Sequence, residues 1–288
     1  MKILVTGKNG QVGYELMRSL QPLGEVIGMD RRQMDLSNLN EVRDVIRRVK
    51  PGLIVNSAAY TAVDRAESEP ELAMQINGLA PGVMAEEAAK LGAAIVHFST
   101  DYVFDGTKLE PYTEADTPCP LNIYGRTKLA GEMAIAATGV PHLIFRTSWV
   151  YGMRGKNFLL TMMRLAAERD ELRVVADQRG APTWCRTLAD TTACILCHAN
   201  GARDSAAWWH ENAGLYHVTA QGETTWYGFA EALLDRAQRK PVLVPINSTE
   251  YPIPAARPSN SRLSCAALVE RFCHLPNWRD ALRLCQDS

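Results

Sequence analysis

The chain lacks the features that mark membrane, secreted and nucleic-acid-binding proteins. No run approaches the roughly 18 apolar residues of a membrane span, and MKILVTGKNG has neither the charged region nor the cleavage site of a secretion signal. The net charge of −1 comes from 31 basic and 32 acidic residues, with no long run of either sign. We therefore expect a cytoplasmic protein that binds neither membranes nor nucleic acid.

Cysteines are few and scattered. Seven occur in 288 residues, and this odd number suits a reducing compartment better than a disulfide framework. Cys194 and Cys197 lie close together beside His198, but a zinc site needs about four ligands and no second pair of matching spacing exists. We expect no metal site, and we expect these cysteines to be reduced core residues on a helix.

The first half of the chain alternates short apolar runs with amphipathic segments. Strands are predicted at 2–6, 25–30, 53–57, 93–99 and 142–147, and helices at 11–20, 39–49, 71–91 (with a break near Pro81) and 124–137. The strands are apolar throughout rather than on alternate residues. This pattern predicts an α/β fold, with a Rossmann-like, doubly wound parallel sheet.

After about residue 150 the pattern loosens. Proline and glycine interrupt it at 180–183 and 251–258, and helices are expected at 158–168, 188–198 and 226–236. We predict a larger domain over residues 1–150 and a smaller C-terminal lobe over 151–288, from which some segments return to the first domain. The stretch 200–213 resembles a surface excursion whose role the sequence does not indicate.

A glycine turn joins the first strand to the first helix. TGKNGQVG spaces Gly7, Gly10 and Gly13 three residues apart at this point. Residues without a Cβ let the backbone approach a pyrophosphate, which then rests on the helix N-terminus. We expect these glycines, with Gln11 and Val12, to bind a dinucleotide; the alternative is a tight turn without a ligand.

Residues after the second strand bear on which dinucleotide binds. Asp30 stands where an acid would bond the ribose of NADH, whereas Arg31 could hold the 2′-phosphate of NADPH. The two signals oppose each other, so both cofactors stay open. Asp35 and Leu36 are candidate adenine contacts, or simply the start of the next helix.

A hydroxyl, a phenol and an amine follow in order. Thr100 ends the fourth strand, and Tyr124 and Lys128 lie four apart on a predicted helix, so they share a face. This set suits carbonyl reduction: the lysine lowers the pKa of the tyrosine, which protonates the oxygen as hydride arrives. The alternative is a core tyrosine and a solvated lysine on an ordinary helix.

These motifs resemble the extended short-chain dehydrogenases/reductases, and within them the dTDP-4-dehydrorhamnose reductases. The resemblance covers nearly the whole chain through GKNGQVGYEL, VNSAAYTAVDRAESEPE, HFSTDYVFDG, PLNIYGRTKLAGE, FRTSWVYG, NFLLTMMRLA, DQRGAPT and ARPSNSRLS. It implies NAD(P)H-dependent reduction of the C4 ketone of a dTDP-4-keto sugar. The first domain would then bind the cofactor and the C-terminal lobe the nucleotide sugar.

The resemblance also assigns roles to residues. It implies catalysis by Thr100, Tyr124 and Lys128, with Tyr124 and Lys128 also contacting the cofactor. Further cofactor contacts would be Ala58, Ala59 and Tyr60. Candidate substrate contacts are Thr100, Asp101, Tyr102, Trp149 and, near the diphosphate, Arg257, whose alternative is an interdomain salt bridge.

One departure concerns metal and oligomer. Some relatives dimerise through Mg²⁺ held by acids at the Glu15 position and near Asp190, but Arg186 stands here where an acid is expected. We expect Arg186 to pair with Glu15 in place of the ion, or the interface to be absent. The chain would then be a monomer or a homodimer without this metal.

Two other functions remain compatible with the same motifs. One is a nucleotide-sugar dehydratase or epimerase of the same fold, although Asp101 and Tyr102 follow Thr100 where dehydratases have Asp-Glu. The other is a non-catalytic, NADP-binding regulatory subunit, like the β subunit of methionine adenosyltransferase.

Overall fold

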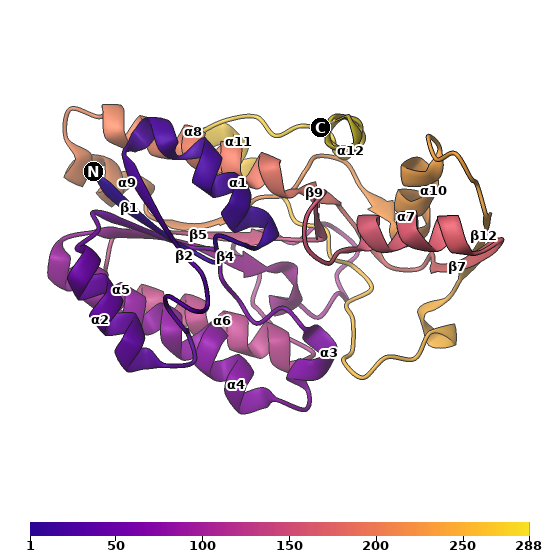
Figure 1. The fold of residues 1–288 in the computed structure, drawn as a ribbon, viewed down its shortest axis with the longest axis horizontal. Helices are drawn as coiled ribbons and strands as arrows, with labels where there is room; N and C mark the ends of the chain where they lie inside the picture. Colours follow the sequence, from indigo (N-terminus) through magenta and orange to yellow (C-terminus); the bar gives the residue numbers. More distant parts are fainter. Residues whose placement is uncertain (288) are drawn as a thin grey trace.

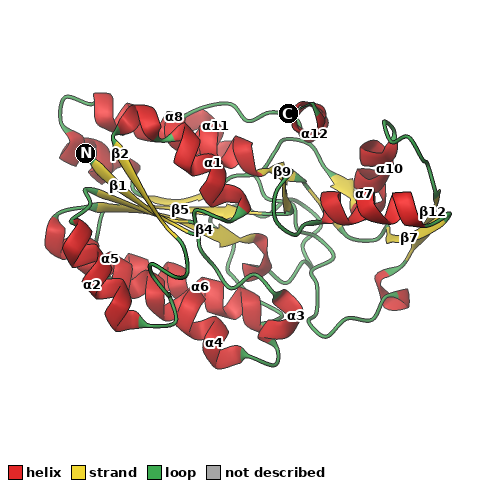
Figure 2. Ribbon diagram, viewed as in Figure 1, coloured by secondary structure: helices red, strands yellow, loops and turns green. Residues whose placement is uncertain are grey.

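The computed structural model describes residues 1–287, and a six-stranded sheet forms its centre (Figure 1, Figure 2). From edge to edge the strands are β2 (Glu25–Met29), β1 (Lys2–Thr6), β3 (Leu53–Asn56), β4 (Ala94–Thr100), β5 (His142–Thr147) and β10 (Gly214–His217). Every neighbouring pair is parallel. The predicted α/β class with a Rossmann-like parallel sheet is confirmed.

Helices cover both faces of this sheet (Figure 1). One face carries α1 (Gln11–Ser19), α8 (Cys185–Gly201) and α11 (Ala266–Arg271), and the other carries α2 (Leu39–Val49), α5 (Ala80–Leu91) and α6 (Ile123–Ala137). Successive strand residues point to opposite faces. Ile3 and Val5 therefore join one apolar cluster and Leu4 joins the other. Burial on both faces explains why the strands are apolar throughout.

A smaller lobe lies at one end of the sheet (Figure 1). It contains α7 (Phe158–Glu168), β7 (Glu171–Val175), α10 (Trp226–Leu234), β12 (Val242–Ile246) and α12 (Trp278–Gln286). β7 and β12 form a parallel pair, and a third apolar cluster gathers around Phe229. The short strand pairs are β6 (Val150–Tyr151) with β9 (Thr183–Trp184) and β8 (Arg179–Gly180) with β11 (Thr224–Thr225).

Short helical pieces complete the chain. They are η1 (Gln21–Leu23), α3 (Val63–Ala66), α4 (Pro70–Met74), the π-helical η2 (Gln75–Leu79), η3 (Asp101–Val103), α9 (Ser205–Asn212) and η4 (Ser248–Glu250). The break predicted near Pro81 occurs just before it, because η2 separates α4 from α5. Within residues 1–287 no helix is long and apolar enough to cross a membrane.

Several segments beyond residue 150 belong to the central sheet. α8 and β10 pack there, and the stretch 200–213 contains α9, whose Trp208 and Trp209 pack against the apolar cluster beneath α1 and α8. The division of the chain at residue 150 therefore stays a prediction. Cys194 and Cys197 do lie on α8, but Cys197 is exposed, so its predicted core location is wrong.

Candidate active site

A pocket lies where the strand order reverses, between the carboxyl ends of β1 and β3. Open α/β sheets bind ligands at such points. This pocket of about 300 Å³ is lined by these predicted cofactor residues: Gly7, Asp30, Arg31, Asp35, Leu36, Ala58, Ala59 and Tyr60. Arg65, from α3, also lines it and was not predicted. The fold thus brings together residues that lie up to about 50 positions apart in the sequence.

The glycine turn leaves room for a phosphate group. Gly7 has φ +70°, and a Cβ added at Gly13 would lie 2.1 Å from the Gly7 oxygen, so both positions require glycine. Gly10 caps α1 without any side-chain hydrogen bond. The first N–H groups of α1, those of Gln11 and Val12, are therefore available to an anion, as a dinucleotide pyrophosphate requires.

Asp30 and Asp35 are both held by local hydrogen bonds. Asp30 accepts from the Arg32 N–H at 3.0 Å and lies 3.7 Å from the Lys8 ammonium. Burial raises the pKa of Asp30, but these contacts outweigh it and the pKa is lowered. Asp35 accepts from the Ser37 N–H at 2.9 Å, while Asn38 caps α2. Asp35 thus belongs to the turn before α2 and lines the pocket as well.

Thr100 and Asp101 lie together at the carboxyl end of β4. The Thr100 hydroxyl donates to Asp101 Oδ1 at 3.0 Å and accepts from the Tyr102 N–H at 3.1 Å. Asp101 is 3% exposed. Burial raises its pKa to about 7, against hydrogen bonds from Ser261 and Thr100 that lower it. Asp101 is therefore a neutral acid below about pH 7.

Tyr124 lies on α6 next to this pair. Its ring meets the Tyr102 ring edge to face at 5.8 Å, and it shares a hydrogen bond with Thr100. Burial and the Asp101 carboxylate raise the pKa of Tyr124 to about 12. The predicted lowering by Lys128 is wrong, because the lysine nitrogen is bonded elsewhere. The phenol stays protonated at neutral pH, as a proton donor must be.

Lys128 is 1% exposed and points into the sheet. Its Nζ donates to the Phe98 carbonyl at 2.5 Å and lies 3.1 Å from His97 Nε2. Burial lowers the pKa of Lys128 to about 8, partly opposed by Glu132. His97 in turn contacts Asn56. His97 stands between Val96 and Phe98 in β4, and Asn56 ends the apolar run of β3, so the sequence marks both positions as polar.

The start of α6 is tied to two other segments. The Asn122 side chain accepts from the Gly125 N–H at 2.8 Å and donates to the Ala256 carbonyl at 2.8 Å. A Cβ at Gly125 would lie 2.0 Å from the Tyr102 oxygen. The helix that carries Tyr124 is therefore pressed directly onto the turn after Thr100.

The predicted substrate residues Trp149 and Arg257 have protein partners of their own. Trp149 has φ +49° and stacks on Trp226, with ring centroids 3.7 Å apart. Arg257 donates to Asp64 at 2.9 Å and lies over the Tyr102 ring at 5.7 Å. A salt bridge, the stated alternative for Arg257, is thus present. Trp226 was missed by the sequence analysis, which treated it only as part of a helix.

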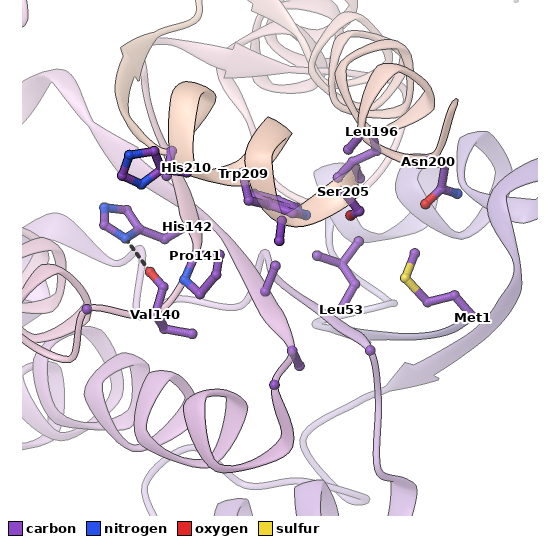
Figure 3. A pocket seen from close by; sticks show the side chains of 18 residues that line it. Met1, Leu53, Val140, Pro141, His142, Leu196, Asn200, Ser205, Trp209 and His210 are labelled. Carbon is purple, nitrogen blue, oxygen red and sulfur yellow. Dashed lines mark hydrogen bonds between the residues drawn. The ribbon is translucent and has the colours of Figure 1, made fainter. Parts of the chain in front are cut away.

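A second pocket, of about 660 Å³, lies at the amino ends of β1, β3, β4 and β5 (Figure 3). Leu53, His142 and Trp209 line it, and His142 Nδ1 donates to the Val140 carbonyl at 2.8 Å. None of the predicted site residues lines this pocket. Its volume exceeds that of the pocket between β1 and β3, but the predicted catalytic residue Thr100 lies at the carboxyl end of β4.

Glu15 of α1 and Arg186 of α8 pair across the surface of the sheet domain. Arg186 Nε lies 3.0 Å from Glu15 Oε2, so the predicted pairing is confirmed. Asp190 accepts from the Ser19 hydroxyl at 2.6 Å. Among residues 1–287, no group of three or more histidine, cysteine or acidic side chains is placed to hold a metal ion.

Comparison with known proteins places these features in context. The family model described as RmlD substrate binding domain matches residues 1–288. The chain is 51% identical over 294 residues to a dTDP-4-dehydrorhamnose reductase of Burkholderia thailandensis, covering 99% of this chain and 98% of the relative.

Solved structures agree. A dTDP-4-dehydrorhamnose reductase of Clostridium acetobutylicum superposes with a TM-score of 0.92 at 38% identity, covering 100% of this chain and 99% of that one. The Bacillus anthracis reductase in complex with NADP superposes with a TM-score of 0.89 at 35% identity, covering 99% and 98%.

Proposed function

The chain belongs to the RmlD substrate binding domain family, and from this premise we propose that it reduces the C4 ketone of dTDP-4-dehydro-L-rhamnose to give dTDP-L-rhamnose. The reductant is NADPH or NADH. The observation that carries the proposal is the end-to-end match of the chain to dTDP-4-dehydrorhamnose reductases. A dinucleotide-type pocket at the carboxyl ends of β1 and β3, and the contact of Tyr124 with Thr100 at the end of β4, support it.

The cofactor pocket suits either dinucleotide. The glycine turn and the N–H groups of Gln11 and Val12 hold the pyrophosphate. Asp30 bonds the adenine ribose of NADH, whereas Arg31 engages the 2′-phosphate of NADPH. The bound dinucleotide supplies a hydride to the C4 carbon of the sugar.

The protein supplies the proton. Tyr124 donates its phenolic hydrogen to the carbonyl oxygen as the carbon accepts the hydride, so the C=O bond becomes C–OH and a phenolate remains. Lys128 bonds the ribose that carries the nicotinamide, and the Thr100 hydroxyl orients the carbonyl oxygen. The raised pKa of Tyr124, about 12, favours this role because the donor is fully protonated before the reaction.

Residues 151–288 are mostly the lobe that holds the nucleotide sugar. Asp101, Tyr102 and Trp149, which precede this lobe in the sequence, contact the sugar. Arg257 leaves Asp64 to engage the diphosphate, because a guanidinium binds phosphate oxygens bidentately. The protein works in the cytoplasm as a monomer or homodimer.

The test supplies the dTDP-4-keto sugar, made with an upstream epimerase, and follows the loss of NADPH or NADH absorbance in parallel reactions. We expect stoichiometric oxidation of at least one cofactor. Oxidation of neither, by protein that binds NADPH, would overturn the assignment and favour a regulatory subunit.

A further inference from the structure

A continuous chain of buried polar groups connects the glycine turn to Lys128. The Thr6 hydroxyl lies 2.6 Å from Asn56 Oδ1, Asn56 Nδ2 lies 2.9 Å from His97 Nδ1, and His97 Nε2 lies 3.1 Å from Lys128 Nζ. None of the four residues is more than 2% exposed. The chain crosses β1, β3, β4 and α6, and Gly7 follows Thr6 directly.

These groups are placed for one another. The sheet register sets Asn56 of β3 beside His97 of β4, between strand positions that are apolar. A buried polar side chain costs stability unless it is hydrogen-bonded. A histidine in this core therefore persists because Asn56 and Lys128 satisfy its two nitrogens.

The hydrogens of this network can be arranged in two consistent ways. A neutral imidazole has one donor and one acceptor nitrogen. With the Asn56 NH₂ facing Nδ1, the His97 proton sits on Nε2 and is donated to a neutral Lys128 amine. With the Asn56 amide rotated by a half turn, Nδ1 donates to its oxygen and Nε2 accepts from a Lys128 ammonium. The Thr6 hydroxyl, which both donates and accepts, serves either orientation.

The other charged groups near Lys128 are engaged elsewhere. On α6, Glu132 lies one turn away and is paired with Arg146 at 2.6 Å. Tyr124, one turn away on the other side, interacts with Thr100 and Asp101. A doubly protonated imidazole is disfavoured, because burial and the lysine charge lower the pKa of His97 well below its usual value.

We propose that His97, oriented by Asn56, is a positioning residue for the reduction: it holds the Lys128 nitrogen in place and adapts its tautomer to the protonation state of that lysine. The proposal rests on the proposed function and adds a residue that acts through Lys128 rather than on the substrate.

The first test compares the pH profile of kcat for wild type, His97→Gln and His97→Leu between pH 6 and 10. Leucine offers Lys128 no acceptor, so the ammonium loses a partner. We expect the alkaline limb to move down by about one pH unit and kcat to fall about tenfold. Glutamine can present either an oxygen or an NH₂ group to Lys128. His97→Gln should therefore keep most of the wild-type kcat and a nearly wild-type alkaline limb. KM for the sugar should stay within about twofold.

His217→Gln is the matched control. His217 is buried on β10 and bonded to the Tyr112 carbonyl, away from Lys128. The alkaline limb of kcat for His217→Gln should therefore coincide with that of wild type. Coincident alkaline limbs of kcat for wild type and folded His97→Leu would overturn the proposal.

A second test needs neither substrate nor turnover. In ¹⁵N-histidine NMR of the wild-type protein, the His97 signal is identified by its loss in His97→Gln. We expect the proton to move from Nδ1 to Nε2 as pH rises and Lys128 loses its proton. A single tautomer throughout would overturn the proposal. Because this readout is independent of activity, failure of the reductase assay alone would reject the proposed function and leave the histidine result standing.

Discussion

In the usual description of an activated tyrosine, a charged lysine lowers the pKa of the tyrosine. Here the pKa of Tyr124 is raised and that of Lys128 is lowered. Burial keeps Tyr124 protonated and makes Lys128 easier to deprotonate. The protonated phenol is the form that a carbonyl reduction requires, since the carbonyl oxygen must receive a proton. The residue that limits the active fraction at high pH is therefore the lysine, whose pKa is about 8.

Replacing Tyr124 with phenylalanine removes the hydroxyl that we propose as the proton donor and keeps the ring. We expect kcat to fall about 10²–10⁴-fold, the usual contribution of a positioned general acid, with NADPH affinity within about twofold of wild type. Steady-state kinetics and a fluorescence titration of NADPH measure the two quantities. Tyr251→Phe, at an exposed tyrosine, is the control. Wild-type turnover in Tyr124→Phe would remove the tyrosine from the mechanism.

Asp101 makes folding stability depend on pH. Its pKa is 3.8 when unfolded and about 7 when folded, so the folded state binds more protons between these values, and stability is lost as pH rises through that window. The full effect is of the order of 4 kcal/mol. Asp101→Asn cannot ionise, so its unfolding free energy should gain on wild type between pH 5 and pH 8 in urea titrations. An equal difference at both pH values would contradict the shift.

At the scale of elements, the position of α6 decides the site geometry. Asn122 anchors the helix start to residue 256, and Gly125 allows contact with the turn of η3. Both contacts lie within one helical turn of Tyr124. A displacement of α6 would therefore move the proton donor away from Thr100, even if the helix stayed intact.

Gly125→Ala tests this contact. The added methyl group would lie 2.0 Å from the Tyr102 oxygen, so the helix must shift. We expect a loss of about 1–3 kcal/mol in stability, by overpacking, and at least a tenfold loss of kcat. Gly201→Ala is the control: it ends α8, nothing lies within 4 Å, and it should be neutral or slightly stabilising. Equal behaviour of the two variants in thermal unfolding and kinetics would refute the argument.

Five of the six strands of the central sheet could be predicted from the sequence, because burial on both faces makes each of them an apolar run. β10 was missed, because its four residues, GLYH, do not form such a run. The glycine turn and Thr100 could be placed for a related reason, since parallel strands bring their carboxyl ends to one side of the sheet. β7 and β12 were missed, because polar residues alternate in ELRVV, a proline interrupts VLVPI, and the two strands lie about 70 residues apart in the sequence. The partner of Lys128 was missed because a histidine inside a strand gives no sign of what it faces.

At the scale of the whole molecule, the Glu15–Arg186 pair neutralises a surface that carries acids on both α1 and α8. Arg186 also lies over the Trp184 ring at 4.8 Å, which fixes its direction. The guanidinium thus occupies the space in front of Glu15. A divalent cation would have to displace it.

We expect the elution volume in gel filtration to be unchanged by EDTA or by MgCl₂, whatever the oligomeric state. Arg186→Glu is the informative variant, because it adds an acid beside Glu15 and Asp190. Its melting temperature should rise with MgCl₂, whereas that of wild type should not. A wild-type dimer that dissociates on chelation would show that the pair does not replace a metal.

The stacked indoles of Trp149 and Trp226 join the two parts of the molecule, since Trp149 follows β5 of the central sheet and Trp226 begins α10 of the lobe. Rings 3.7 Å apart and within 11° of parallel have coupled electronic transitions. The near-ultraviolet circular dichroism spectrum therefore depends on the relative orientation of these two rings, and through them of sheet and lobe. Any rotation of the lobe relative to the sheet will change that spectrum, so such a motion can be followed without an added label.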